Sequence, residues 1–138
     1  MSDKNSILLI SDDKNFAEVL KSKLIFLRKD DAIITSNFDE AEQNLKLSLA
    51  NIVLVHESTS KTETSELIKF LRQNKDICII LLANAYNEEF ILTCYDIGID
   101  DFAMSNAEAF ELVIRVVNNI KHNSIKLQAL QNSKILEH

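Results

Sequence analysis

The stretch Ile77-Cys78-Ile79-Ile80-Leu81-Leu82 is apolar throughout, with no polar residue alternating in it. Two shorter runs of the same kind, Ile7-Leu8-Leu9-Ile10 and Ile52-Val53-Leu54-Val55, precede it in the chain. A strand with one solvated face alternates apolar and polar residues, whereas a parallel strand covered by helices on both faces is apolar throughout. The three runs therefore predict buried central strands of a parallel sheet.

Weaker strands and amphipathic helices surround these runs. Ala32-Ile33-Ile34 and Asp100-Asp101-Phe102-Ala103-Met104 are short and flanked by polar residues, as edge strands are. Between the runs, apolar residues recur every three or four positions, the period of a helix that covers a core. The five sets are Phe16, Leu20, Leu24 and Leu27; Phe38, Ala41, Leu45 and Leu49; Leu67, Ile68 and Leu71; Phe90, Ile91 and Cys94; and Phe110, Val113, Ile114, Val117 and Ile120. This alternation predicts an α/β fold with a doubly wound parallel sheet and right-handed crossovers.

Turn residues are unusual in this chain, which has one glycine and no proline. Gly98 follows the fourth helical segment, where a left-handed residue commonly ends a helix. Asparagine tolerates positive φ better than most residues. We therefore expect asparagines such as Asn74 and Asn84 to occupy other left-handed turns.

Composition restricts the class of protein. A chain of 138 residues fits one domain, and its net charge of −6 argues against direct binding to nucleic acid. No apolar stretch approaches the ~20 residues that cross a membrane, and the start MSDKNS lacks the apolar segment of a signal peptide. We expect a cytoplasmic protein, in which Cys78 and Cys94 are two small buried side chains without a disulfide.

Polar residues follow each predicted strand, and in open parallel sheets the functional groups gather at the carboxyl ends of the strands. These ends carry Ser11-Asp12-Asp13, His56-Glu57, Ala83-Asn84 and Ser105-Asn106. Carboxylates beside a histidine can bind a divalent cation or exchange protons.

The order of these motifs resembles that of a response-regulator receiver domain of two-component signalling. Asn51-Ile52-Val53-Leu54-Val55 is similar to the family's Asp-Leu-Val-Leu-Leu, and Gly98-Ile99-Asp100-Asp101-Phe102 is similar to its Gly-Ala-Asp-Asp-Tyr. The similarity runs from about Ser6 to Lys121. It implies a flavodoxin-like (βα)5 fold with strand order 2-1-3-4-5 and a regulatory role in phosphorelay signal transduction.

The resemblance also implies which residues hold the reactive positions, and four of the five are substituted. His56 occupies the position of the phosphoryl-accepting aspartate. The other three substituted positions hold Ser11 for the first acidic residue, Ala83 for the hydroxyl residue and Ser105 for the lysine. Asp12 keeps the position of the usual Mg²⁺ ligand and Asp13 adds a carboxylate, so these two are the candidate metal ligands.

Phosphoryl transfer to a carboxylate needs that carboxylate, a divalent metal and cations that neutralise the developing charge. The sequence therefore predicts a non-enzymatic pseudo-receiver without a cofactor, with weak Mg²⁺ binding left open. Two alternatives remain: an atypical response regulator that is still phosphorylated or binds metal at the strand ends, and a flavodoxin-like cofactor-binding domain. The acidic loop after the first strand would repel the phosphate of a cofactor.

His56 has four interpretations at this stage. It could accept a phosphoryl group, or ligate a metal with Asp12, with or without Glu57. It could also place a positive charge against Asp12 and Asp13, or lie solvated in a loop. Phe102 occupies the position of the family's switch aromatic, and we expect it to be a fixed packing or interface residue.

We divide the chain into a receiver-like domain at residues 1–121, a helical extension or linker toward an output domain at 122–135, and a remnant resembling a purification tag at 136–138. An imperfect apolar stripe continues along the extension, formed by Val113, Val117, Ile120, Leu127 and Leu130. We therefore expect a protein partner or self-association through the fourth and fifth helices and the extension.

Overall fold

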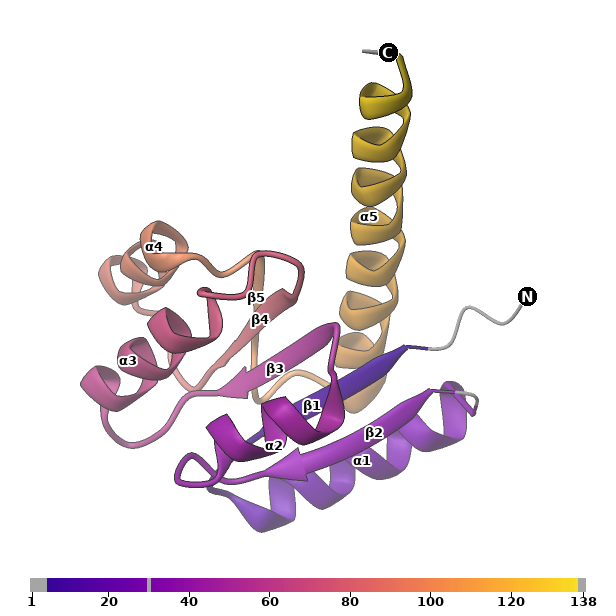
Figure 1. The fold of residues 1–138 in the computed structure, drawn as a ribbon. Coiled ribbons are helices and arrows are strands. Elements are labelled where there is room, and N and C mark those ends of the chain that lie inside the picture. The colour runs from indigo at the N-terminus through magenta and orange to yellow at the C-terminus, as the bar shows by residue number, and fades with distance from the viewer. Residues whose placement is uncertain (1–4, 30, 137–138) are drawn as a thin grey trace.

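Five parallel strands form one sheet in the order β2-β1-β3-β4-β5 in the computed structural model, which describes residues 5–29 and 31–136 (Figure 1). The strands are β1 (Ser6–Ile10), β2 (Ala32–Ser36), β3 (Ile52–His56), β4 (Cys78–Ala83) and β5 (Asp101–Met104). The helices are α1 (Lys14–Leu27), α2 (Ala41–Ser48), α3 (Lys61–Leu71), α4 (Glu88–Ile97) and α5 (Ala109–Leu136). The predicted flavodoxin-like architecture and strand order are confirmed.

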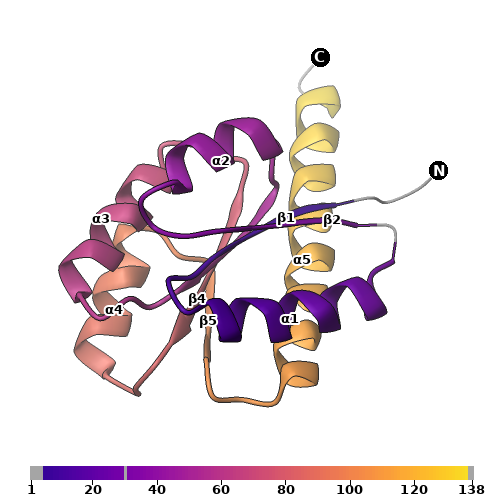
Figure 2. The same ribbon diagram turned by 90° about the horizontal axis from the view of Figure 1, so that it is seen from below.

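The sheet is covered on both faces. Helices α1 and α5 lie on one face, and α2, α3 and α4 lie on the other (Figures 1 and 2). All residues of β3 and β4 are buried, as are the last four residues of β1. The uninterrupted apolar runs follow from this layering, because the side chains on either face of these strands meet a helix layer.

Polar side chains cap three of the helices at their amino ends. The carboxylate of Asp13 accepts a hydrogen bond from the backbone N–H of Phe16 at 3.0 Å, so Asp13 is the N-cap of α1. Ser60 caps α3 and Asn87 caps α4 in the same way. Each cap satisfies a backbone N–H that the helix cannot pair internally.

The two cysteines lie on opposite faces of the sheet. Cys78 belongs to the core beneath α1 and α5, and Cys94 to the core beneath α3 and α4. Both are buried and free, as expected. Burial raises the pKa of the Cys78 thiol to about 12 and that of Cys94 to about 11, so both are neutral near pH 7.

Several expectations about the periphery were wrong. Leu27, predicted to cover the core, is 40% exposed at the end of α1. Leu49 is 84% exposed and takes φ 52° at the end of α2, so it does not continue that helix's buried stripe. It is the one non-glycine residue with positive φ within residues 5–29 and 31–136, so Asn74 and Asn84 do not take left-handed turns. Phe110 and Ile114 are exposed, because α5 buries Leu112, Val113 and Val116 instead.

The helix α5 runs 28 residues and projects beyond the sheet (Figure 1). Its backbone is helical through Leu136, while the side chains of Leu127 and Leu130 lie outside the described residues, and the division of the chain after residue 121 stays a prediction. Within the described part of the chain, no helix is both long and apolar enough to span a bilayer.

Arg72 joins α3 to the amino-terminal ends of β4 and β5. Its guanidinium donates to the carbonyl of Gly98 at 2.8 Å, to the carbonyl of Ile77 at 3.0 Å and to the carboxylate of Asp100 at 2.7 Å. Asp100 also accepts from the backbone N–H of Ile79 at 2.8 Å. The planar, multidentate guanidinium suits this position because it satisfies three acceptors at once.

The single glycine is required by this contact. Gly98 has φ 140°, and a Cβ at this position would lie 2.6 Å from Cγ of Arg72. We predict that Gly98→Ala lowers the free energy of unfolding by about 1–3 kcal/mol, because alanine strains the backbone and displaces Arg72. Urea denaturation measures this loss, and Ala107→Gly in the loop before α5 serves as a reference. An unchanged midpoint for Gly98→Ala would contradict this account of Gly98.

Candidate functional site at the carboxyl edge of the sheet

His56 is the last residue of β3 and is buried, with 7% of its surface exposed. Its Nδ1 lies 2.8 Å from Oγ of Ser11, which follows β1. Its Nε2 lies 2.7 Å from Oδ1 of Asn84, which follows β4. The imidazole therefore joins the ends of three adjacent strands.

The neighbours of His56 fix which nitrogen donates. The side-chain N–H of Asn84 donates to the carbonyl of Glu57 at 3.0 Å, which turns Oδ1 of Asn84 toward the ring. Nε2 must then donate to that oxygen, while Nδ1 pairs with the hydroxyl of Ser11, which also lies 3.3 Å from the carbonyl oxygen of Asp13. Ser105 donates its hydroxyl to the same Oδ1 at 2.8 Å. We call these four side chains, Ser11, His56, Asn84 and Ser105, the strand-end network.

Phe16 covers the histidine ring. The two rings are stacked, with centroids 4.0 Å apart and an interplanar angle of 27°. Phe16 lies in the first turn of α1, which is held by the Asp13 cap. The interpretation of His56 as a solvated loop residue is therefore wrong, because stacking and two hydrogen bonds fix the imidazole in one orientation.

The two aspartates after β1 do not contact His56 in the structure. The carboxylate of Asp12 accepts from the backbone N–H of Phe38 at 3.0 Å, and that of Asp13 caps α1. Within residues 5–29 and 31–136, no three His, Cys, Asp or Glu side chains converge as a metal site would require. Metal binding by Asp12 and Asp13 stays a prediction, and the structure gives each carboxylate a role within the fold.

A polar hollow of about 620 Å³ opens beside the network, at the ends of β1 and β2. Its charged lining consists of one ammonium group and four carboxylates, those of Lys14, Asp12, Glu18, Asp39 and Glu40. The excess of negative charge makes this hollow unfavourable for a phosphate group.

The remaining positions singled out in the sequence lie at the ends of β4 and β5. Ala83 is buried, and its carbonyl accepts from the backbone N–H of Ser105 at 2.8 Å. Phe102 lies between Tyr95, whose ring meets it edge-on with centroids 6.2 Å apart, and Tyr86 at 6.4 Å. The structure thus brings Ser11, His56 and Ser105 into one network through Asn84, and it places Phe102 in a separate aromatic cluster.

The sequence did not reveal the roles of Asn84, Phe16 and Glu57. Asn84 follows a strand end, a position that indicates polar chemistry, yet nothing in its spacing assigns it to His56. The helical spacing of Phe16 with Leu20 and Leu24 predicts only a core residue of α1. Glu57 is 7% exposed, although a charged residue after a strand is ordinarily solvated.

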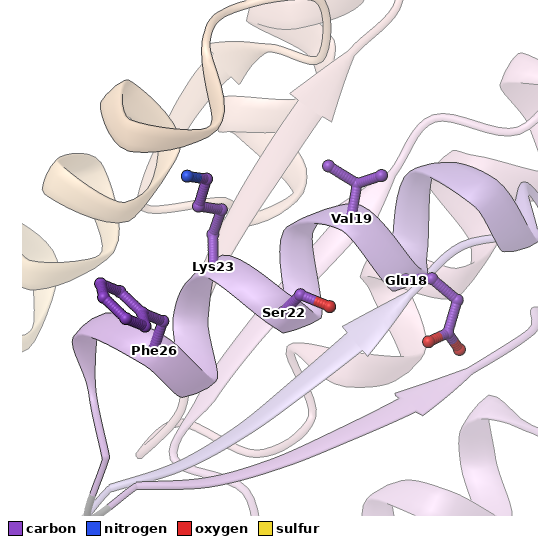
Figure 3. A pocket seen from close by; sticks show the side chains of 5 residues that line it. All are labelled: Glu18, Val19, Ser22, Lys23 and Phe26. Atoms are coloured by element: carbon purple, nitrogen blue, oxygen red, sulfur yellow. The ribbon is translucent and has the colours of Figure 1, made fainter.

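A second hollow, of about 490 Å³, lies on the outer surface of α1 (Figure 3). Its described lining comes from that one helix and consists of Glu18, Val19, Ser22, Lys23 and Phe26. Val19 and Phe26 are 54% and 70% exposed. These side chains offer an apolar surface without converging polar groups, so the strand-end network remains the candidate site.

The comparisons with known proteins show similarity of fold. No protein-family model and no curated protein matches the sequence. Among solved structures, a CheY-like response regulator receiver domain from Methanospirillum hungatei matches with a TM-score of 0.80 and 15% identity, covering 90% of this chain and 99% of that one. The BeF3-activated receiver domain of Klebsiella pneumoniae RstA matches with a TM-score of 0.70 and 20% identity, covering 84% and 98%.

A longer protein contains the same fold as one part. NtrX from Brucella abortus, solved in complex with ADP, matches with a TM-score of 0.82 and 14% identity, covering 98% of this chain and 30% of that one. The likeness to the two receiver domains shows that this chain has the receiver-domain fold.

We predict that His56→Phe lowers the free energy of unfolding by about 1–3 kcal/mol, because phenylalanine keeps the stack on Phe16 but loses the hydrogen bonds to Ser11 and Asn84. Urea denaturation measures the loss. Ser105→Ala is the control, and it should change stability by less than about 0.5 kcal/mol because its hydrogen bond is exposed. Equal stability of His56→Phe and the unsubstituted protein would mean that the network does not hold the strand ends together.

Proposed function

We propose that this chain is a receiver-like regulatory module of a two-component or related signalling protein, that it is not phosphorylated, and that it acts in the cytoplasm through protein–protein contacts. The observation that carries the proposal is the strand-end network. His56 stands at the end of β3, and its two ring nitrogens are already engaged with Ser11 and Asn84.

The network lacks the groups that phosphoryl transfer uses. No carboxylate is available at position 56, and the residue after β5 is Ser105, which has no positive charge to place on an incoming phosphoryl group. Nδ1 of His56 is occupied by a hydroxyl, and Nε2 carries a proton donated to Asn84, so neither nitrogen presents a free lone pair as a nucleophile. The adjacent acidic hollow adds repulsion against an anionic phosphodonor.

We predict that incubation with acetyl phosphate and Mg²⁺ adds no phosphoryl group to this protein, because the nucleophile and the neutralising cation are both missing. Intact mass spectrometry measures the result, and a receiver domain that retains its aspartate serves as the parallel control. A stable gain of about 80 Da would contradict the proposal. It would favour the alternative of an atypical response regulator that is still phosphorylated.

The outer surface of α4, β5 and α5 is the surface that we propose for the protein contact. Tyr86 and Leu92 are 66% and 63% exposed, and Ile114 on α5 is 42% exposed. Tyr95 packs on Phe102 of β5, and burial together with the charge of Asp101 raises the pKa of its phenol. Exposed aromatic and aliphatic side chains are enriched at protein interfaces, which favours these elements as the contact surface.

We predict that the double variant Leu92→Ser/Ile114→Ser weakens self-association of the protein at least about tenfold, because it removes two exposed apolar side chains, one from α4 and one from α5. Concentration-dependent light scattering measures the effect. Phe26→Ser on α1 and Leu47→Ser on α2 are the controls, since these side chains, at 70% and 74% exposed, are more exposed than Leu92 and Ile114. A protein that is monomeric at millimolar concentration would exclude self-association and leave the contact to a different protein.

A further inference from the structure

Glu57 is a buried carboxylate that the proposed function does not use. It follows β3 directly, and its side chain is only 6% exposed. A buried carboxylate costs free energy unless charged or polar groups are placed around it. The groups around Glu57 therefore indicate what this part of the edge is built to hold.

Two donors from different elements meet this carboxylate. The backbone N–H of Asn84, just after β4, donates to Oε1 at 2.9 Å. The ammonium group of Lys61, at the start of α3, lies 3.3 Å from Oε2. A backbone N–H and an ammonium that converge from two elements are the donors of a small-anion site. In this protein the anion is a side chain of the chain itself.

Lys61 extends the contact to a third element. Its ammonium lies 5.3 Å from the centre of the Phe90 ring, which belongs to the first turn of α4. The ammonium thus lies between the carboxylate of Glu57 and the face of an aromatic ring, an arrangement that favours a cation. The charge of Glu57 is therefore linked, through Lys61 and Phe90, to the position of α4.

We propose that Asn84 N–H and Lys61 form an anion-binding site that the Glu57 carboxylate fills permanently, and that this internal ligand fixes α4 against the sheet. This inference goes beyond the proposed function, because it assigns a binding site and a conformational role to residues that take no part in phosphorylation chemistry. The site accepts a small carboxylate once Glu57 no longer fills it.

A second ion pair on the same helix provides a matched comparison. Lys69 and Glu66 are also 3.3 Å apart, but their side chains are 58% and 64% exposed. Exposed pairs of this kind contribute little to stability, because water screens them and both side chains lose freedom. Glu66→Ala therefore removes an ion pair of equal length that has no built site around it.

The variant Glu57→Ala tests the proposal. Alanine lacks the four heavy atoms Cγ, Cδ, Oε1 and Oε2, which are together the atoms of acetate. We expect Glu57→Ala to melt at a lower temperature than the unsubstituted protein, and acetate to raise its melting temperature with saturation. So small a ligand should half-saturate on the order of 10 mM. The amide resonances of α4 should shift in the variant and return toward their original positions with acetate.

The controls separate binding from salt effects and from damage to the fold. Potassium chloride at the same ionic strength and neutral acetamide should not rescue Glu57→Ala. Glu57→Gln keeps the side-chain volume, so acetate should not stabilise it, and Glu66→Ala should respond to neither additive. If Glu57→Ala is unfolded without additive, acetate should restore its folded amide spectrum.

Two results would overturn the inference. One is that chloride stabilises Glu57→Ala as much as acetate does. The other is that 200 mM acetate, on the order of twenty times the half-saturating concentration, does not stabilise Glu57→Ala. Phosphorylation of the unsubstituted protein is a separate measurement. A phosphoryl mass gain would contradict the proposed function, whereas only the acetate experiment decides whether Glu57 fills an anion site.

Discussion

The burial of the central strands on both faces is the constraint on which the rest of the structure depends. Residues Ile7–Ile10, Ile52–Val55 and Ile79–Leu82 are at most 2% exposed, and all of these strand side chains are apolar. Polar chemistry is thereby confined to the two ends of the strands. Burial extends to the carboxyl end, where an unpaired polar group would cost about 1–3 kcal/mol. Within the described residues, every buried side-chain nitrogen and oxygen has a hydrogen-bond partner.

The sequence was sufficient to predict the fold and the residues that meet at the strand ends. Apolar runs without alternation require two covering layers, and parallel strands bring their carboxyl ends to one edge whatever the details of the loops. The partners at that edge could not be predicted. Whether His56 faced Asp12, Glu57 or Asn84 depends on rotamers and loop backbone, and these are fixed by the Asp13 cap and by the ring of Phe16.

Helical periodicity was least informative where a helix is apolar on two sides. In α5 the sets Phe110/Ile114 and Leu112/Val113/Val116 both have helical spacing, and only packing decides which set faces the sheet. Of the set left outside, Ile114 is one of the exposed residues proposed for protein contacts. Leu49 is a different case, since neither the core nor any contact in the structure explains a leucine in a left-handed conformation at the end of α2.

The strand-end residues also depend on one another, which limits what a single substitution could achieve. An aspartate at position 56 would place its carboxylate next to Oδ1 of Asn84, an acceptor held in place by the carbonyl of Glu57. Two acceptors facing each other repel, and Ser105 offers a hydroxyl where a cation would be needed to hold the pair. Turning the Asn84 amide to donate would leave the Glu57 carbonyl without its donor. The substituted residues therefore form one mutually compatible set, in which the imidazole of His56 pairs through Nε2 with Oδ1 of Asn84 and through Nδ1 with the hydroxyl of Ser11.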